Sequence, residues 1–359
     1  MARYFYGIFS IKKNEEGVML RIVKLIFILM LFSLFVIGCA GGSGATGSKD
    51  TNIEPKITAT AGANGVISPQ GTVDVNRGSD LSFTFTADAN YYVLDVVVDD
   101  VSLGPMTSYT FKHVTSDHRI RASFDTEHQI ITLGDSITEG YGDDISADDI
   151  SQDGRNNGGG FQPILNNLLT AHEKGFPNNI INEGVGGDTS ADGLAYISTA
   201  LVLYPAAKSY LVQYGTNDAN PMLPIPSGKG LHPGDPGYPG TYKDNLQQII
   251  NAINGAGKQV CLAKPPITLG DTVNGTQYVD PDTGARNLQI KEYNQVIDEL
   301  VNDFSNHIII IPPNFYNYFK EIDPVTGNSR YKDQFSDNLH PNGIGYQSMA
   351  ELWFEALTQ

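Results

Sequence analysis

The chain is poor in positive charge, cysteine and tryptophan. Its 359 residues include 23 Lys and Arg against 40 Asp and Glu, which gives a formal net charge of −17 at pH 7. Domains that bind nucleic acid carry basic patches, and this chain has no basic run beyond its N-terminus. We therefore expect no nucleic acid among its partners. Hydrophobic residues make up 40% of the chain, enough for a substantial core, and the length favours two domains.

No apolar run is long enough to span a bilayer comfortably. The longest, residues 25–37, is interrupted by Ser33 and is preceded by Arg21 and Lys24. A short apolar stretch after a basic segment is typical of a signal peptide.

The apolar run ends in Val36-Ile37-Gly38-Cys39-Ala40, which resembles the lipobox of bacterial lipoproteins. The resemblance implies that residues 1–38 are a lipoprotein signal peptide and that Cys39 carries lipid. The protein would then be exported and anchored in a membrane, facing the periplasm or the cell exterior. An ordinary signal peptide, or an uncleaved anchor with an incidental cysteine, is the alternative. Residues 39–55 are expected to form a flexible tether, and Cys261, the second of two cysteines, would have no disulfide partner.

Residues 56–125 alternate apolar and polar side chains in short runs separated by turn signals. Leu81, Phe83 and Phe85, for example, share one face of a predicted strand. Asn64 is expected to supply the positive φ that a tight turn requires. The pattern favours a small all-β domain, built as an antiparallel sandwich.

Most of this module resembles the divergent internalin-type B-repeat of bacterial surface proteins. The resemblance is carried by residues 57–69, 92–100, 109–111 and 120–124. It implies an immunoglobulin-like or ubiquitin-like spacer without catalytic residues. Contact of the module with cell-surface glycans is the alternative, but sugar-binding platforms favour exposed tryptophan, and the module contains none.

Residues 126–359 alternate apolar runs with longer amphipathic stretches, which is typical of a parallel sheet covered by helices. The predicted strands are residues 129–133, 179–182, 209–213, 259–263 and 307–311. The predicted helices are residues 162–171, 190–202, 242–255, 288–303 and 343–357. Together they predict a flavodoxin-like three-layer α/β/α domain with a five-stranded parallel sheet.

The chemistry of a serine nucleophile is distributed between the two ends of this domain. A serine hydroxyl is a weak nucleophile at neutral pH unless an imidazole takes its proton and a carboxylate orients that imidazole. Ser136 follows a predicted buried strand and a tight turn, and Asp337 and His340 supply the carboxylate and imidazole three residues apart. The sequence therefore predicts a serine hydrolase.

Four ordered blocks strengthen this prediction: Gly134-Asp-Ser-Ile-Thr138, Asn182-Glu-Gly-Val-Gly-Gly-Asp-Thr189, Gly215-Thr-Asn-Asp218 and Asp337-Asn-Leu-His-Pro341. Together they resemble the four blocks of the SGNH (GDSL-type) hydrolases, over residues 129–359.

The resemblance assigns a catalytic triad of Ser136, His340 and Asp337. It also assigns an oxyanion hole to the backbone N–H groups of Ser136 and Gly187 and the side-chain amide of Asn217. Fixed neutral donors of this kind stabilise the negative charge that develops during acyl transfer.

Neighbouring residues are given structural roles. Asp135 and Asp218 are expected to cap turns and position the blocks rather than to act as catalytic acids, and Thr189 is expected to cap a helix. Residues 149–154 superficially match the first half of a calcium loop, but Gly160 stands where that loop needs a bidentate glutamate. The acidic and Gly-rich residues 143–160 are expected to form a solvated loop beside the nucleophile that shapes one wall of the cleft. The Pro/Gly-rich loop of residues 220–240 is a candidate lid or acyl-pocket wall.

The leading hypothesis is a carboxylester hydrolase that forms an acyl-enzyme on Ser136 and acts at the cell surface. Its expected substrates are short-chain acyl or lysophospholipid-type esters. The alternatives are a carbohydrate O-acetylesterase or acyltransferase on extracellular polysaccharide, and an inactive surface adhesion protein. No motif implies a cofactor or a metal. The expected partners are the ester substrate and, through Cys39, a membrane.

Overall fold

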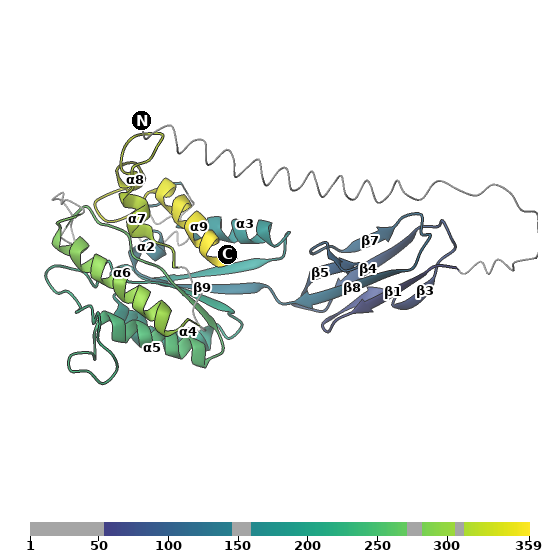
Figure 1. The fold of residues 1–359 in the computed structure, drawn as a ribbon, viewed down its shortest axis with the longest axis horizontal. Coiled ribbons are helices and arrows are strands. Elements are labelled where there is room, and N and C mark those ends of the chain that lie inside the picture. The colour runs from purple at the N-terminus through teal and green to yellow at the C-terminus, as the bar shows by residue number, and fades with distance from the viewer. Residues whose placement is uncertain (1–53, 146–158, 271–281, 306–311) are drawn as a thin grey trace, which may run out of the picture. The chain divides into compact units, whose positions relative to one another are not determined.

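The structure is a computed structural model that describes residues 54–145, 159–270, 282–305 and 312–359. Residues Glu54–Gln359 form one compact unit, and within it the buried apolar side chains fall into two separate clusters. One cluster lies in a β-module and the other in an α/β domain (Figure 1). The predicted boundary between residues 125 and 126 stays a prediction. Among the described residues, no helix combines the length and the apolar character needed to cross a bilayer.

The β-module consists of a five-stranded and a three-stranded sheet. The first has the order β3-β1-β8-β5-β6 and the second the order β2-β4-β7. The strands are β1 (Lys56–Ala61), β2 (Gly65–Ser68), β3 (Gly71–Asp74), β4 (Leu81–Ala87), β5 (Tyr92–Val98), β6 (Val101–Ser102), β7 (Ser108–Phe111) and β8 (His118–Asp125). Phe83 and Phe111 pack edge to face across β4 and β7, with ring centroids 5.9 Å apart. Asn64 takes the predicted positive φ, 69°.

The prediction of a purely antiparallel sandwich is wrong in one respect. Strands β1 and β8, the first and last of the module, pair in parallel, with Ile57 opposite His118 and Ala61 opposite Ala122. Parallel partners need a long crossover connection, and the whole intervening module supplies it here. Periodicity within each strand reports which side chains are buried, but it carries no information about which strands are neighbours.

The α/β domain has a parallel sheet of four described strands in the order β10-β9-β11-β12. The strands are β9 (His128–Gly134), β10 (Asn178–Gly184), β11 (Ser209–Gln213) and β12 (Gln259–Leu262). Every residue of β11 is buried, as expected for a central strand covered on both faces. The predicted fifth strand, residues 307–311, lies outside the described residues. Immediately after it, Asn314 forms a parallel bridge with Lys264.

Helices cover both faces of this sheet, as the predicted three-layer fold requires. Figure 1 shows α4, α5 and α6 on one face and α3 and α9 on the other. The helices are α2 (Ser136–Glu139), α3 (Gln162–His172), α4 (Ser190–Leu203), α5 (Tyr242–Gly255), α6 (Ala285–Asp303), α7 (Phe315–Lys320), α8 (Arg330–Gln334) and α9 (Gly343–Thr358).

Local capping decides where three of these helices begin. The Thr189 hydroxyl accepts a hydrogen bond from the Asp192 N–H in a capping box, which confirms its predicted role. Thr241 and Asn342 cap α5 and α9 in the same way. Helix α6 begins three residues before its predicted start because Gly284 takes the extended N-cap position.

Candidate active site

Ser136 lies at the carboxyl edge of the sheet. Strand β9 ends at Gly134, Asp135 caps α2, and Ser136 is the first residue of that short helix. A Cβ at residue 134 would collide with the Thr138 hydroxyl and with the Gln213 carbonyl oxygen. Glycine therefore permits the sharp turn that leaves Ser136 half-buried while its neighbours are buried.

The structure brings Ser136 and His340 together across 204 residues of sequence. The Ser136 Oγ lies 2.9 Å from the His340 Nε2, and the His340 Nδ1 lies 2.8 Å from the Asp337 Oδ2. These distances fit a hydroxyl that donates to an imidazole whose other nitrogen donates to a carboxylate. The arrangement permits proton transfer from the serine to the histidine.

The Asp337 carboxylate is fixed by its own turn. Its Oδ1 accepts hydrogen bonds from the backbone N–H groups of Leu339, at 2.6 Å, and His340, at 2.7 Å. Partial burial opposes ionisation of Asp337, but the side-chain and backbone hydrogen bonds from His340 outweigh it and lower its pKa. The carboxylate is therefore ionised at neutral pH and can stabilise a protonated His340.

Of the three predicted oxyanion donors, the Ser136 N–H begins α2, and Gly187 and Asn217 lie on the loops that follow β10 and β11. Gly187 adopts a positive φ of 95°, and a Cβ at this position would meet no atom within 4 Å. The Asn217 Nδ2 donates to the Asp188 carbonyl oxygen at 3.0 Å. An amide nitrogen carries two hydrogens, so this bond orients Asn217 and leaves its second hydrogen for a ligand.

Asp218 connects the loop that follows β11 to the start of α4, which follows the β10 loop. Its carboxylate accepts hydrogen bonds from the Ser190 N–H, at 3.0 and 3.1 Å, and from the Ser190 hydroxyl, and that hydroxyl also accepts from the Asn245 side chain. Burial raises the pKa of Asp218 to about 6, against the lowering effect of the Ser190 bonds. Its predicted positioning role is confirmed.

Asp135 is buried beneath the nucleophile. Its Oδ1 accepts a hydrogen bond from the Ile137 N–H at 2.9 Å, which confirms its predicted role as a cap. Burial raises the pKa of this carboxyl to about 7, and the hydrogen bond from Ile137 and the nearby His340 oppose the rise.

A loop after α2 contacts the histidine and was missed by sequence reasoning. The Tyr141 ring packs on the His340 ring, with centroids 4.4 Å apart, and the Tyr141 carbonyl oxygen accepts from the buried Tyr346 hydroxyl at 2.8 Å. A Cβ on the adjacent Gly142 would collide with the Ser336 hydroxyl and lie 2.9 Å from the Pro341 carbonyl oxygen. No pattern in the sequence identifies this contact, because it joins segments almost 200 residues apart.

A second missed element supports the turn that carries the triad. Asn287 on α6 is fully buried, and its side chain accepts from the Thr268 N–H at 2.8 Å and donates to the Thr268 carbonyl oxygen at 2.7 Å. The next residue, Leu269, donates its N–H to the Asn338 carbonyl oxygen at 2.7 Å. Asn338 lies between Asp337 and His340, so Asn287 is linked to the triad through one backbone segment.

The Pro/Gly-rich loop is held to the domain near its middle and is exposed near its start. The buried Lys243 donates to the Leu231 carbonyl oxygen at 2.9 Å and to Glu299 at 2.6 Å. Met222 and Leu223, at the start of the loop, are 69% and 82% exposed. The predicted role of this loop as a lid or acyl-pocket wall stays a prediction.

Several predicted features lie wholly or partly outside the described residues. These are Cys39 and most of the acidic loop of residues 143–160. The described residues contain no group of three or more His, Cys, Asp or Glu side chains that could hold a metal ion. Cys261 is buried in the sheet, and burial raises the pKa of its thiol.

Comparisons with known proteins agree with this geometry. A family model described as GDSL-like Lipase/Acylhydrolase matches residues 130–353. No curated protein sequence is significantly similar to the chain.

Three solved structures are similar to part of the chain. A lipase/acylhydrolase from Enterococcus faecalis is 23% identical over 64% of this chain and 95% of its own, with a TM-score of 0.43. LAE5, an alpha/beta hydrolase enzyme from the metagenome of Lake Arreo, is 20% identical over 64% and 94%, with a TM-score of 0.44. A catalytic mutant of the acetylxylan esterase Axe2 from Geobacillus stearothermophilus is 15% identical over 65% and 94%, with a TM-score of 0.45. With identities below 25% and TM-scores below 0.5, these structures give no information about the substrate of this chain.

Proposed function

Because the chain belongs to the GDSL-like lipase/acylhydrolase family and is a serine ester hydrolase, we propose that Ser136, His340 and Asp337 are its catalytic triad. The observation that carries the proposal is the continuous contact from the Ser136 Oγ to the His340 Nε2, at 2.9 Å, and from the His340 Nδ1 to Asp337, at 2.8 Å.

The reaction proceeds in two acyl transfers. His340 takes the Ser136 proton as the serine oxygen bonds to the ester carbonyl carbon, and the N–H groups of Ser136 and Gly187 and the Asn217 amide stabilise the oxyanion. The tetrahedral intermediate then collapses, the carbon–alkoxy bond breaks, and His340 returns the proton to the leaving alcohol. Water repeats the sequence on the acyl-enzyme, with His340 as base, and releases the carboxylic acid.

The proposed substrates are short-chain acyl or lysophospholipid-type esters. Exposed apolar side chains on the segments that carry the site support this choice. Val185 follows β10 and is 49% exposed, and Met222 and Leu223 follow Asn217 closely. An acyl chain reaching beyond the carbonyl could contact such side chains and bury apolar surface.

An acyl-length series with the full chain tests both proposals. We expect hydrolysis of p-nitrophenyl esters from acetate to octanoate, and Ser136→Ala should reduce it by at least ~10³-fold. Equal rates in the variant would contradict the Ser136 mechanism. Activity confined to acetate would reject the longer acyl chains and favour an O-acetylesterase, and ester formation on an added glycan would favour an acyltransferase.

We further propose that the enzyme is a lipoprotein held at the cell surface through Cys39. The motif around Cys39 and the Gly/Ser-rich residues that follow support this localisation. In bacteria expressing the full chain, wild type should fractionate with membranes, and Cys39→Ala should not carry lipid. An unmodified Cys39 in the mass spectrum of the wild-type protein would contradict the proposal.

A further inference from the structure

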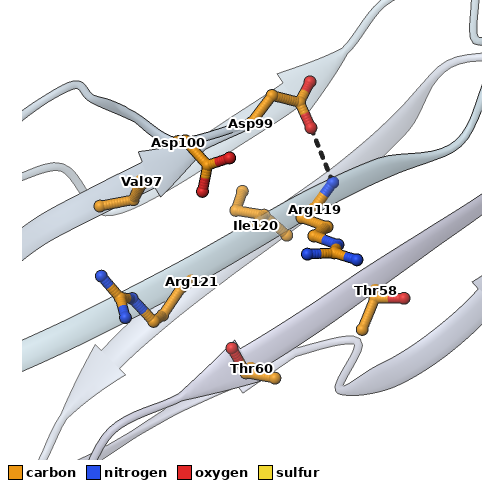
Figure 2. A pocket seen from close by; sticks show the side chains of 8 residues that line it. All are labelled: Thr58, Thr60, Val97, Asp99, Asp100, Arg119, Ile120 and Arg121. Atoms are coloured by element: carbon orange, nitrogen blue, oxygen red, sulfur yellow. Dashed lines mark hydrogen bonds between the residues drawn. The ribbon is translucent and has the colours of Figure 1, made fainter.

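The outer face of the five-stranded sheet in the β-module carries a hollow of about 420 Å³. Figure 2 shows Arg119 and Arg121 of β8 between the threonines of β1 and the residues of β5 and its turn. The polar lining consists of Thr58, Thr60, Asp99, Asp100, Arg119 and Arg121, and Val97 lies among them.

The strand register arranges these side chains in two rows. Thr58 is directly opposite Arg119, and Thr60 is opposite Arg121 on the parallel partner strand. On its other side, Arg121 is opposite Val97. Residues two apart on a strand are about 7 Å apart along it, and neighbouring strands are about 4.8 Å apart. Each row therefore places a hydroxyl beside a guanidinium, and the two guanidinium groups point from the same face.

Neither guanidinium group has a hydrogen bond or ion pair within the described part of the chain. Asp99, the acid at the end of the first row, has both oxygens engaged elsewhere. Its Oδ2 lies 2.6 Å from the His118 Nδ1, and its Oδ1 accepts the backbone N–H of Arg119 at 2.8 Å. In contrast, Arg77 of the same module donates to the Thr115 carbonyl oxygen at 2.8 Å. The charge of Arg119 does help to lower the pKa of Asp99. Two neighbouring guanidinium groups without a salt bridge among the described residues are still notable in a chain with 40 acidic and 23 basic residues.

We infer that this face binds an acidic polysaccharide, with Arg119 and Arg121 holding its carboxylates and Thr58 and Thr60 hydrogen-bonding its hydroxyl groups. A guanidinium group presents paired N–H donors that match a carboxylate, and a threonine hydroxyl both donates and accepts. The hollow is lined by no aromatic ring, so a neutral sugar has no stacking surface here.

The charge of the whole chain selects among anionic polymers. A net charge of −17 repels a dense polyanion such as polyphosphate more strongly than a polymer with one charge per sugar. The consequence is retention of the enzyme on such a polymer, which would raise the local concentration of any ester the polymer carries.

Affinity electrophoresis of the full chain in gels containing polygalacturonate tests the inference. We expect the wild type to be retarded by polygalacturonate and not by neutral dextran, with retardation lost at high salt. The double variant Arg119→Gln/Arg121→Gln should bind at least ~10-fold more weakly, whereas Arg77→Gln, a matched change in the same module, should bind like the wild type. Equal retardation of wild type and double variant, or retardation by dextran, would overturn the inference.

A second variant and a second readout exclude misfolding as the cause. Arg121→Lys keeps the charge and the aliphatic chain but loses the paired donors, and we expect ~3-fold or greater weakening with an unchanged unfolding midpoint. Ser136→Ala should bind polygalacturonate normally, so the failure of catalysis and the failure of this inference are distinguishable. Binding of polyphosphate with no binding of polygalacturonate would contradict the assignment to a carboxylate polymer.

Discussion

Asp135 is adjacent in sequence to the proposed nucleophile, yet this residue is only 1% exposed. Its carboxyl group caps α2 by accepting a hydrogen bond from the Ile137 N–H. A buried acid with a raised pKa holds a proton in the folded state at a pH where the unfolded chain has lost it. Folding is therefore coupled to pH at this residue, independently of the catalytic step.

The sign of this coupling gives a prediction for stability. Between the unfolded pKa of 3.8 and the folded pKa of about 7, the folded state binds more protons, so the free energy of unfolding should fall as pH rises through this window. The fall in the free energy of unfolding that is attributable to Asp135 is on the order of 4 kcal/mol. Asp218, with its pKa raised to about 6, acts in the same direction. Urea unfolding at a series of pH values from 4 to 7.5 measures this decrease in the free energy of unfolding.

Asp135→Asn keeps the oxygen that caps α2 and removes the titration, so its stability should depend less on pH than that of the wild type. Asp88→Asn, a change at an exposed residue of the β-module, is the matched control and should leave the slope unchanged. An Asp135→Asn protein with the wild-type slope would show that this carboxyl does not titrate in the window.

At the scale of the elements, the loop after α2 and the turn before α9 pack against each other through Gly142. Gly142→Ala should reduce turnover about tenfold, because a Cβ there displaces residues 336–341, which carry His340. Gly175→Ala is the matched control, since Gly175 has a similar φ of 96° but nothing within 4 Å of a new Cβ. The control should lose about 1 kcal/mol of stability and retain full turnover. Identical turnover in the two variants would argue against the packing role.

The segment after β12 gives a second prediction at this scale. Asn287→Ala leaves the N–H and the carbonyl oxygen of Thr268 without their partner, which should cost about 2 kcal/mol or more. If Asn287 also positions the triad through Leu269 and Asn338, kcat should fall about tenfold with KM nearly constant.

The exposed neighbour on the same helix, Leu288, supplies the control for this experiment. Leu288→Ala should change neither kcat nor stability by much. If the Asn287→Ala enzyme is destabilised but keeps the wild-type kcat, Asn287 stabilises the fold and does not position the triad.

At the scale of the whole molecule, every proposed catalytic group lies between residues 134 and 340, and the β-module has its own buried cluster. A chain shortened to residues 126–359 should therefore hydrolyse p-nitrophenyl acetate with a kcat/KM within about twofold of that of residues 39–359. A tenfold loss would show that the β-module contributes to the site, provided that circular dichroism shows both chains folded.

The sequence by itself determined four strands, the five long helices and the four blocks of the α/β domain, whereas the short helices α2, α7 and α8 were not predicted. The ends of α5 and β11 match their predicted bounds, because apolar runs of strand length and capping residues such as Thr241 act over a few residues. The pairing of Ser136 with His340 was predictable for a different reason, since the chemistry of a serine nucleophile demands such a partner.

Only the tertiary structure decided which distant segments are neighbours. The parallel pairing of β1 with β8, the packing of Tyr141 on His340 and the link from Asn287 to Asn338 each join parts of the chain that share no local pattern. The same holds for Arg119 and Arg121 of β8, whose guanidinium groups form no salt bridge among the described residues because strand register places Thr58, Thr60 and Val97 opposite them. Local propensity acts over a few residues, whereas these contacts form only when the whole chain packs.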